Sequence, residues 1–195
     1  MQKEKLKQIL TNDNITTCIN NNLDILLDII PELKDILNFE HNNPHHHLNV
    51  WEHTLLALSL SPNNFEIRLA LLLHDIGKPH SYQDKEIRHF KDHPKVSAEI
   101  TFKILKRLNF DNQEISKIYY LVKQHDNRIS TKEIFENKEL AIQRFQIQIC
   151  DALAHHPEKL EKRIAYLNYI NEKLDNKLNI KEYQKKLTKK ISNIV

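Results

Sequence analysis

The residues most able to do chemistry are a histidine and an aspartate that stand side by side. They are His74 and Asp75, at the end of the apolar run LLLHDIGKP at residues 71–79. An imidazole and a carboxylate are costly to bury unless a charged group compensates them. A divalent metal bound by both is a common compensation. The pair therefore predicts a metal site in the core.

Other histidines and aspartates fall on apolar helical faces. His53 lies three residues after Val50 and four before Ala57, and His125 and Asp151 continue apolar series of the same spacing. Residues three and four apart share one face of a helix, so these side chains should point inward. A single inward histidine is more often a hydrogen-bonded core residue than a ligand. Several of them with two inward carboxylates, however, are better explained by a metal, and His93 is a further candidate.

The elements that must position these residues are helical. The chain has one glycine among 195 residues, which leaves few positions for tight hairpins. Apolar spacing predicts helices over residues 6–10, 23–37 with a break at Pro31, 48–60, 65–75, 94–108, 113–125, 140–156 and 158–174. Residues 78–92 and 126–138 should be the longer loops, the second with room for a short helix. The fold class is therefore predicted to be all-α.

Net charge and cysteine content indicate the kind of partner and the cellular compartment to expect. The net charge is +3 with neutral histidines, which suits anionic partners without marking a dedicated nucleic-acid binder. Cys18 and Cys150 form no CxxC pair, and no apolar segment approaches the roughly 20 residues that span a bilayer. We expect a cytoplasmic protein with no membrane partner and an oligomeric state that the sequence does not reveal.

The C-terminal stretch is basic and weakly amphipathic. One stripe of it carries Tyr183, Leu187, Ile191 and Val195. This pattern favours a docked terminal helix over an RNA- or membrane-contacting tail.

Several short motifs follow one another in order along the chain. They are NPHH at residues 43–46, VWEHT at 50–54, LLLHDIGKP at 71–79, HFKDH at 89–93 with Ser97-Ala98, and LVKQH at 121–125. This set resembles the HD superfamily of metal-dependent phosphohydrolases, whose pattern is His, His-Asp, Asp. It is closer still to the HD domain attached to bacterial CCA-adding tRNA nucleotidyltransferases. The likeness covers residues 42–156.

The resemblance implies a helical bundle with a metal site in its core. One divalent ion would be bound by His53, His74, Asp75 and Asp151, and in many members a second by His93 and His125 with Asp75 bridging. Mixed imidazole and carboxylate ligands place Mn, Fe, Ni or Co ahead of Mg and Zn. Two such ions, about 3.5 to 4 Å apart, make a bridging hydroxide the nucleophile.

Further residues are expected to act on substrate. Asp75, Lys78 and His46 are the predicted catalytic residues: Lys78 would neutralise a phosphate oxygen, and His46 would contact phosphate or protonate the leaving oxygen. A solvated lysine after a helix end is the competing interpretation of Lys78. Candidate contacts for an anionic substrate are Lys78, Arg88, Arg128 and Arg144. The remaining histidines are expected to face solvent or to support the ligands from behind, among them His41, His45, His47, His80, His89, His155 and His156.

The predicted function is hydrolysis of phosphomonoester or phosphodiester bonds in nucleotides or RNA ends, such as 2′,3′-cyclic phosphates. The partner would be a phosphorylated small molecule, a nucleotide or an RNA end. Two alternatives stay open. One is a non-catalytic RNA- or protein-binding module with a structural metal, and the other is a nucleoside 5′-monophosphatase or a dinucleotide polyphosphate hydrolase.

The chain departs from some relatives of this pattern. No Gly-rich turn followed by an Asp-x-Asp pair precedes residue 42, so the resemblance does not imply nucleotide addition. The acidic pair typical of guanosine-tetraphosphate hydrolases and the Gly-Tyr-Pro of cyclic-di-GMP phosphodiesterases are both missing after His74-Asp75. We expect N-terminal helices over residues 1–41, a phosphohydrolase core over 42–156, and C-terminal helices over 157–195 that complete the same domain.

Overall fold

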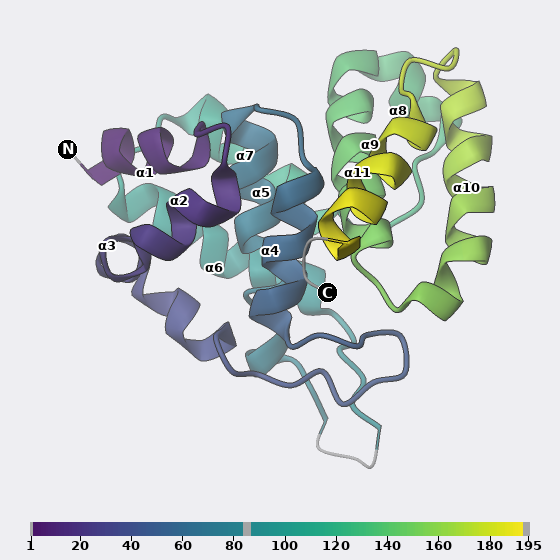
Figure 1. The fold of residues 1–195 in the computed structure, drawn as a ribbon. Helices are drawn as coiled ribbons and strands as arrows, with labels where there is room; N and C mark the ends of the chain where they lie inside the picture. Colours follow the sequence, from purple (N-terminus) through teal and green to yellow (C-terminus); the bar gives the residue numbers. More distant parts are fainter. Residues whose placement is uncertain (1, 84–86, 193–195) are drawn as a thin grey trace.

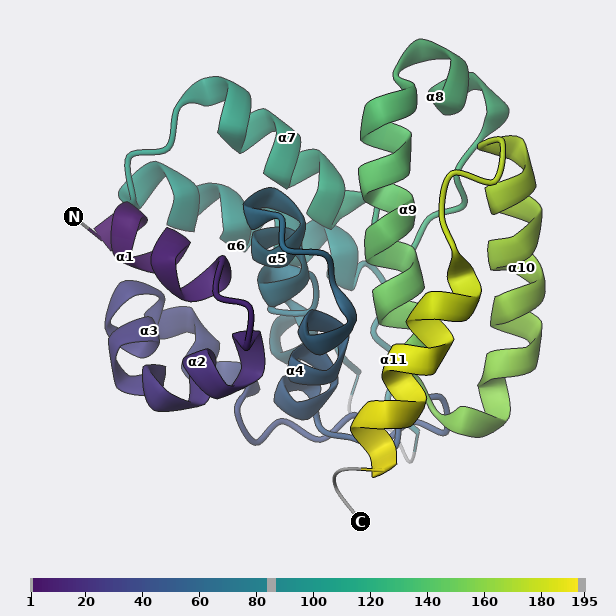
Figure 2. The ribbon, with the colours of Figure 1, turned by 45° about the horizontal axis from the view of Figure 1, so that its top comes forward.

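The protein is built from α-helices and short 3-10 turns (Figures 1 and 2). A computed structural model describes residues 2–83 and 87–192. Within these ranges the only β-type pairing is an isolated bridge between Gln83 and His89, so the all-α prediction is confirmed. The elements are α1 (Gln2–Leu10), α2 (Ile15–Asn21), α3 (Leu23–Ile29), η1 (Pro31–Ile36), α4 (Val50–Leu60), α5 (Phe65–Leu73), η2 (Lys78–His80), α6 (His93–Arg107), α7 (Asn112–Lys123), α8 (Thr131–Glu136), α9 (Lys138–Leu153), η3 (Pro157–Lys159), α10 (Leu160–Lys173) and α11 (Ile180–Ser192).

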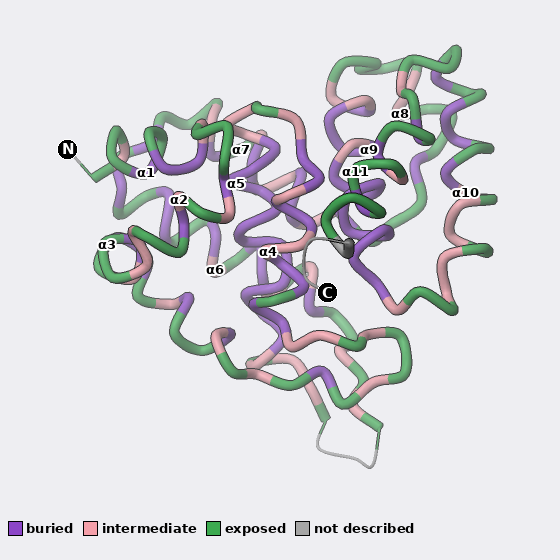
Figure 3. Tube along the Cα trace, in the orientation of Figure 1, coloured by how far each residue is buried: buried purple, intermediate pink, exposed green. Residues whose placement is uncertain are grey.

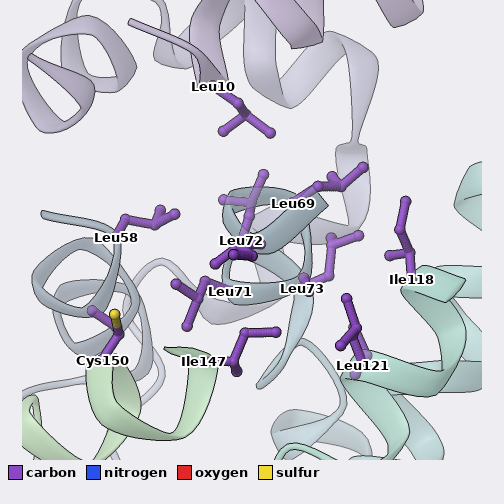
Figure 4. Close-up of a cluster of buried hydrophobic side chains, with 14 of the residues drawn as sticks. Leu10, Leu58, Leu69, Leu71, Leu72, Leu73, Ile118, Leu121, Ile147 and Cys150 are labelled. Atoms are coloured by element: carbon purple, nitrogen blue, oxygen red, sulfur yellow. The ribbon is translucent and has the colours of Figure 1, made fainter. Parts of the chain in front are cut away.

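Helix α5 forms the centre of the molecule. Its sequence FEIRLALLL is apolar on almost every face, and such a helix is stable only when other helices surround it. It packs against α4, α6, α7 and α9. Figure 4 shows Leu71 of α5 among Leu58, Ile147 and Cys150, with Leu121 nearby. The central helix therefore carries the residues that follow it, His74 and Asp75, into the middle of the bundle.

Two groups of helices flank this centre. Helices α1 to α3 lie on one side, and α8 to α11 lie on the other (Figure 1). The inner faces of the central helices are buried, whereas the outer turns are exposed (Figure 3). In α11, Tyr183 and Leu187 are buried, and the helix contacts α4 and α9, as expected of a docked terminal helix. The side chain of Ile191 and all of Val195 lie outside the described part.

The predicted helices differ from the observed ones in a few places. Helix α2 was not predicted, because ITTCINN contains β-branched residues and asparagines of low helix propensity; it is stabilised by burial of Ile15 and Ile19. The break at Pro31 and the short helix inside residues 126–138 are confirmed. Helix α5 ends at Leu73, so His74 and Asp75 lie in the turn that follows it. None of the described helices is long and apolar enough to cross a membrane.

Candidate metal centre

The ends of five helices meet at one place in the core. His53 lies in the first turn of α4, whose start is fixed by a capping box between Asn49 and Glu52. His74 and Asp75 lie in the turn after α5. His93 begins α6, His125 is the residue beyond the C-cap of α7, and Asp151 lies in the last turn of α9. All six predicted metal ligands therefore lie together.

The six side chains form two clusters that share Asp75. In the first, His53 Nε2 lies 2.9 Å from Asp151 Oδ1 and 3.3 Å from His74 Nε2. Asp75 Oδ2 is 3.2 Å from His74 Nε2. In the second cluster, His93 Nε2 lies 3.2 Å from both His125 Nε2 and Asp75 Oδ1. Asp75 thus presents one carboxylate oxygen to each cluster, which is the arrangement of a bridging ligand.

The orientation of the imidazoles fits metal binding. The Nδ1 atoms of His53, His74, His93 and His125 lie 3.2, 2.6, 2.8 and 2.7 Å from backbone carbonyl oxygens. A carbonyl only accepts, so each Nδ1 carries a ring proton, and each Nε2 faces the centre as the nitrogen available to an ion. Two Nε2 atoms 3.2 to 3.3 Å apart, as in the pairs His53–His74 and His93–His125, need a proton or a metal ion between them. Two donors each about 2.0–2.2 Å from one ion would stand about 3 Å apart, which matches this spacing.

The electrostatics of the site also call for a cation. Asp75 and Asp151 are only 1% and 7% exposed. Burial opposes ionisation of Asp75, but the charges of His74 and Lys78 hold its pKa well below the usual range. Burial likewise disfavours a charged His74, yet Asp75 and Asp151 raise the pKa of that imidazole to about 10. Two buried carboxylates therefore create a potential strong enough to attract either a proton or a metal ion, and the donor set fits a divalent ion.

Lys78 belongs to the site and not to the solvent. Its side chain is 4% exposed, and Nζ lies 2.6 Å from Asp75 Oδ2 and 2.9 Å from His41 Nε2. The competing interpretation of a solvated lysine is therefore wrong. Since an ammonium group has three N–H bonds, one of them remains for a ligand in the cavity that Lys78 lines.

A cavity of about 470 Å³ opens over both clusters. Its lining includes four of the predicted ligands, Asp75, His93, His125 and Asp151, together with Lys78 and His46. Four further basic side chains line it, namely Lys91, Lys95, Lys123 and Arg163. A cavity lined by carboxylates, imidazoles and cations suits an anionic substrate bound to metal.

Three histidines support the first cluster. The His46 ring stacks on His41 with centroids 3.7 Å apart, and it lies 4.4 Å from His155. Burial and the charge of Lys78 hold the pKa of His46 far below its ordinary value, so this imidazole is neutral. His41 and His155 are 1% and 7% exposed, so neither faces solvent. His41 fits the expected supporting role, since it accepts from Lys78.

His155 is a ligand candidate that the sequence analysis left out. One of its ring nitrogens lies close enough to ligand atoms of His53 and Asp151 for the three to hold one ion. Its Nδ1 is 2.8 Å from the backbone oxygen of Asp151. The available signal was the spacing of four residues after Asp151, which places both on one helical face.

The three arginines expected to contact substrate occupy different places. Arg144 is 1% exposed, and its guanidinium bonds Glu133 and the carbonyl oxygens of residues 124, 127 and 128. The expectation of an anion contact therefore does not hold for Arg144, which fixes the loop before α8. Arg88 donates to the Glu40 carbonyl and covers the rings of Phe39 and Tyr82, outside the cavity lining.

Arg128 lies beside the centre, in the wall of a second cavity that adjoins the first. Arg163 of α10 lines both cavities, and the sequence analysis missed it. Nothing in the local sequence LEKRIAYL distinguishes Arg163 from a surface arginine, because its position depends on how α10 packs on α9.

Comparison with known proteins agrees with this geometry. Residues 45–186 match the family model described as the HD domain. The chain belongs to the HD-domain family. HD domains bind divalent metals and are generally metal-dependent phosphohydrolases, and the His/Asp clusters of this chain are suited to a metal ion.

Curated relatives of this HD domain are larger proteins. The chain is 31% identical over 159 residues to the A-adding tRNA nucleotidyltransferase of Deinococcus radiodurans, covering 73% of this chain and 36% of that protein. It is 38% identical over 108 residues to the CC-adding tRNA nucleotidyltransferase of Thermus thermophilus, covering 51% of this chain and 25% of that protein. The chain thus spans about a third or less of each relative, and the resemblance to the HD domain of such enzymes is confirmed.

Proposed function

We propose that this HD domain hydrolyses phosphomonoester or phosphodiester bonds in nucleotides or RNA ends, of which 2′,3′-cyclic phosphates are the first to test. The observation that carries the proposal is the placement of Asp75. Its two oxygens face two histidine clusters in a cavity whose lining includes five lysine and arginine side chains as well as Asp92 and Asp126. A merely structural metal would be enclosed by its ligands, whereas this centre opens to the cavity.

The position of each side chain at the site indicates its proposed role. When bound, one or two divalent ions would supply Lewis-acid polarisation of the phosphoryl group and an activated water. His53, His74 and Asp151 would hold one ion, and His93 and His125 the other, with Asp75 shared. Lys78 helps to keep Asp75 ionised, and its remaining N–H would donate to a phosphate oxygen. His46, as a neutral imidazole on the cavity wall, would hydrogen-bond phosphate.

The ions most compatible with this donor set are Mn, Fe, Ni and Co. Imidazole nitrogens favour borderline metals, and carboxylates accept harder ones, so Mg and Zn follow. The RNA-end assignment draws on the two relatives, which are named as tRNA nucleotidyltransferases. A nucleoside 5′-monophosphatase or a dinucleotide polyphosphate hydrolase would use the same centre, and substrate profiling separates these activities.

The deciding experiment compares metal content and turnover. Tag-free protein is analysed for metals and assayed on bis-p-nitrophenyl phosphate and 2′,3′-cyclic AMP with added Mn or Ni. We expect two ions per chain and a rate that falls roughly 100-fold or more in Asp75→Asn, since a lost bridging ligand removes several kcal/mol of transition-state stabilisation. Asp24→Asn, on the exposed face of α3, is the matched control and should retain both.

A second candidate, the binding module, rests on the relatives, in which the HD domain forms part of a larger RNA-acting enzyme. It predicts that the wild type binds metal but turns over no phosphoester, and that Asp151→Ala has a lower melting temperature than the wild type. That combination of results would replace the hydrolase proposal.

A further inference from the structure

We infer that the second cavity binds the nucleotide unit next to the scissile phosphate, so that the preferred substrate is a single-stranded oligonucleotide end and not a mononucleotide. This inference rests on the proposed function, because it extends the same site. The cavity measures about 260 Å³ and is bounded by α9, α10 and residues 125–128.

The two cavities meet at the metal centre. Both are lined by His125, Asp126, Asn127, Asp151 and Arg163. Two of these residues, His125 and Asp151, are proposed metal ligands. A phosphoester held over the ions therefore has its neighbouring group at the mouth of the second cavity.

Three cations line this second cavity, and of the carboxylates beside them Asp126 interacts electrostatically with Arg163. No hydrogen bond or ion pair joins the charged groups of Arg128, Lys162 or Arg163 to another residue of the described ranges. By contrast, the buried Arg144 nearby uses its donors on Glu133 and backbone carbonyls. Arg128 and Lys162, whose charged groups make none of these contacts, fit an anionic ligand better than a structural role.

Part of the cavity lining is apolar. Ala152, Leu167 and the ring of Tyr166 provide a surface on which a base or ribose can pack. The Tyr166 hydroxyl donates to Gln148 Oε1 at 3.3 Å, and Gln148 Nε2 donates to the His125 carbonyl at 3.0 Å. The wall is thereby joined to a metal ligand, which fixes the distance between this subsite and the reacting phosphate.

The volume of the second cavity limits the size of the anionic ligand that it can hold. Pockets for drug-sized ligands measure about 300–1,000 Å³, so 260 Å³ suits one nucleotide unit and excludes a folded RNA. Cations and apolar side chains in one lining match a phosphate followed by a nucleoside.

A series of three substrates tests the inference. They are adenosine 2′,3′-cyclic phosphate, the same compound with a 5′-phosphate, and the dinucleotide ApA ending in a 2′,3′-cyclic phosphate. We expect kcat/KM to rise with the added phosphate and again with the added nucleoside, on the order of tenfold for the latter because stacking stabilises each base. The double variant Arg128→Ala with Lys162→Ala should flatten this series. Lys5→Ala with Lys103→Ala, on exposed turns of α1 and α6, removes the same charge elsewhere and should leave it unchanged.

Two results would overturn the inference: equal kcat/KM for all three substrates in the wild type, or a series that stays steep in the double variant. A gain from the 5′-phosphate with none from the second nucleoside would overturn the nucleotide assignment in favour of a simple anion site. If no substrate turns over, the proposed function fails, and calorimetric dissociation constants of the same three ligands decide the inference alone. Binding that tightens along the series and is lost in the double variant supports it, and length-independent binding refutes it.

Discussion

Asp75 is the residue on which both clusters depend. Its two oxygens face different pairs of imidazoles, while Lys78 balances its charge from the side of Oδ2. Each of the other ligands belongs to one cluster alone. Removal of a ligand from one cluster should therefore leave the other cluster able to bind an ion, and only Asp75 should affect both.

This separation predicts different metal contents for two variants. His93→Ala should lose the ion of the second cluster and keep about one ion per chain, with the lost site weakened at least about 100-fold. Asp151→Ala should lose the ion of the first cluster. Elemental analysis together with metal titration measures both. If His93→Ala binds as many ions as the wild type, the second cluster is not a metal site.

The contact between η2 and α6 sets the spacing of the clusters. Gly77, the only glycine of the chain, donates its N–H to Ser97 Oγ at 2.9 Å. A Cβ on Gly77 would stand 2.5 Å from the Ser97 nitrogen and 2.9 Å from the carbonyl carbon of Val96. These are backbone atoms and cannot swing aside, so only glycine lets α6 bring His93 to Asp75.

Gly77→Ala should therefore both destabilise the protein and disturb the second cluster. Overpacking of this kind costs about 1–3 kcal/mol, measurable by urea unfolding. The displaced α6 should also weaken binding of the second ion. Ser97→Ala is the comparison, since it loses the hydrogen bond without a clash and should keep both ions. Equal metal affinity in Gly77→Ala and the wild type would contradict this account.

Helix α8 is attached to the core through one carboxylate. The Glu133 carboxylate accepts hydrogen bonds from the N–H of Ser130, the N-cap residue of α8, and from the Tyr120 hydroxyl. It also forms an ion pair with the buried Arg144. Burial raises its pKa, but the hydrogen bonds from Tyr120 and Ser130 and the charge of Arg144 lower it to about 2. Because the folded-state pKa is depressed, the stabilisation is fully present above the ordinary value of 4.5 and is lost as the pH falls toward 2.

The free energy of unfolding of Glu133→Gln should reflect this dependence. The wild type should exceed the variant most at pH 6 to 7, and the difference should shrink as the pH falls below about 4.5. Urea unfolding at a series of pH values measures it. Glu136→Gln, on the exposed side of the same helix, should show no such trend. A constant difference for Glu133→Gln would show that the ion pair is not the cause.

The molecule as a whole should be stabilised by the ions its core binds. The ligands come from α4, the turn after α5, α6, α7 and α9, so an ion joins helices from most of the chain. A ligand that binds only the folded state stabilises it by about 2.7 kcal/mol at 100 times its dissociation constant. For a chain of this length, that corresponds to a rise in melting temperature of about 5–10 °C.

Differential scanning fluorimetry with and without a chelator tests this linkage. We expect added Mn to raise the melting temperature of the wild type and to have much less effect on Asp75→Asn. The two proteins should melt alike in the chelator apart from the local change at residue 75. A melting temperature independent of metal would contradict the metal centre itself.

The sequence by itself determined the helical class, most helix positions and the six residues that converge, because apolar spacing records which face of a helix is buried. It also indicated the family, since the motifs stand in order along the chain. Only the tertiary structure decided what depends on helix packing: the end of α5 before His74, the burial of Lys78 and Arg144, the supporting position of His41, and the place of His155 and Arg163 at the site. Local periodicity cannot encode these, because the ends of sequence-distant helices meet through contacts that no single segment contains.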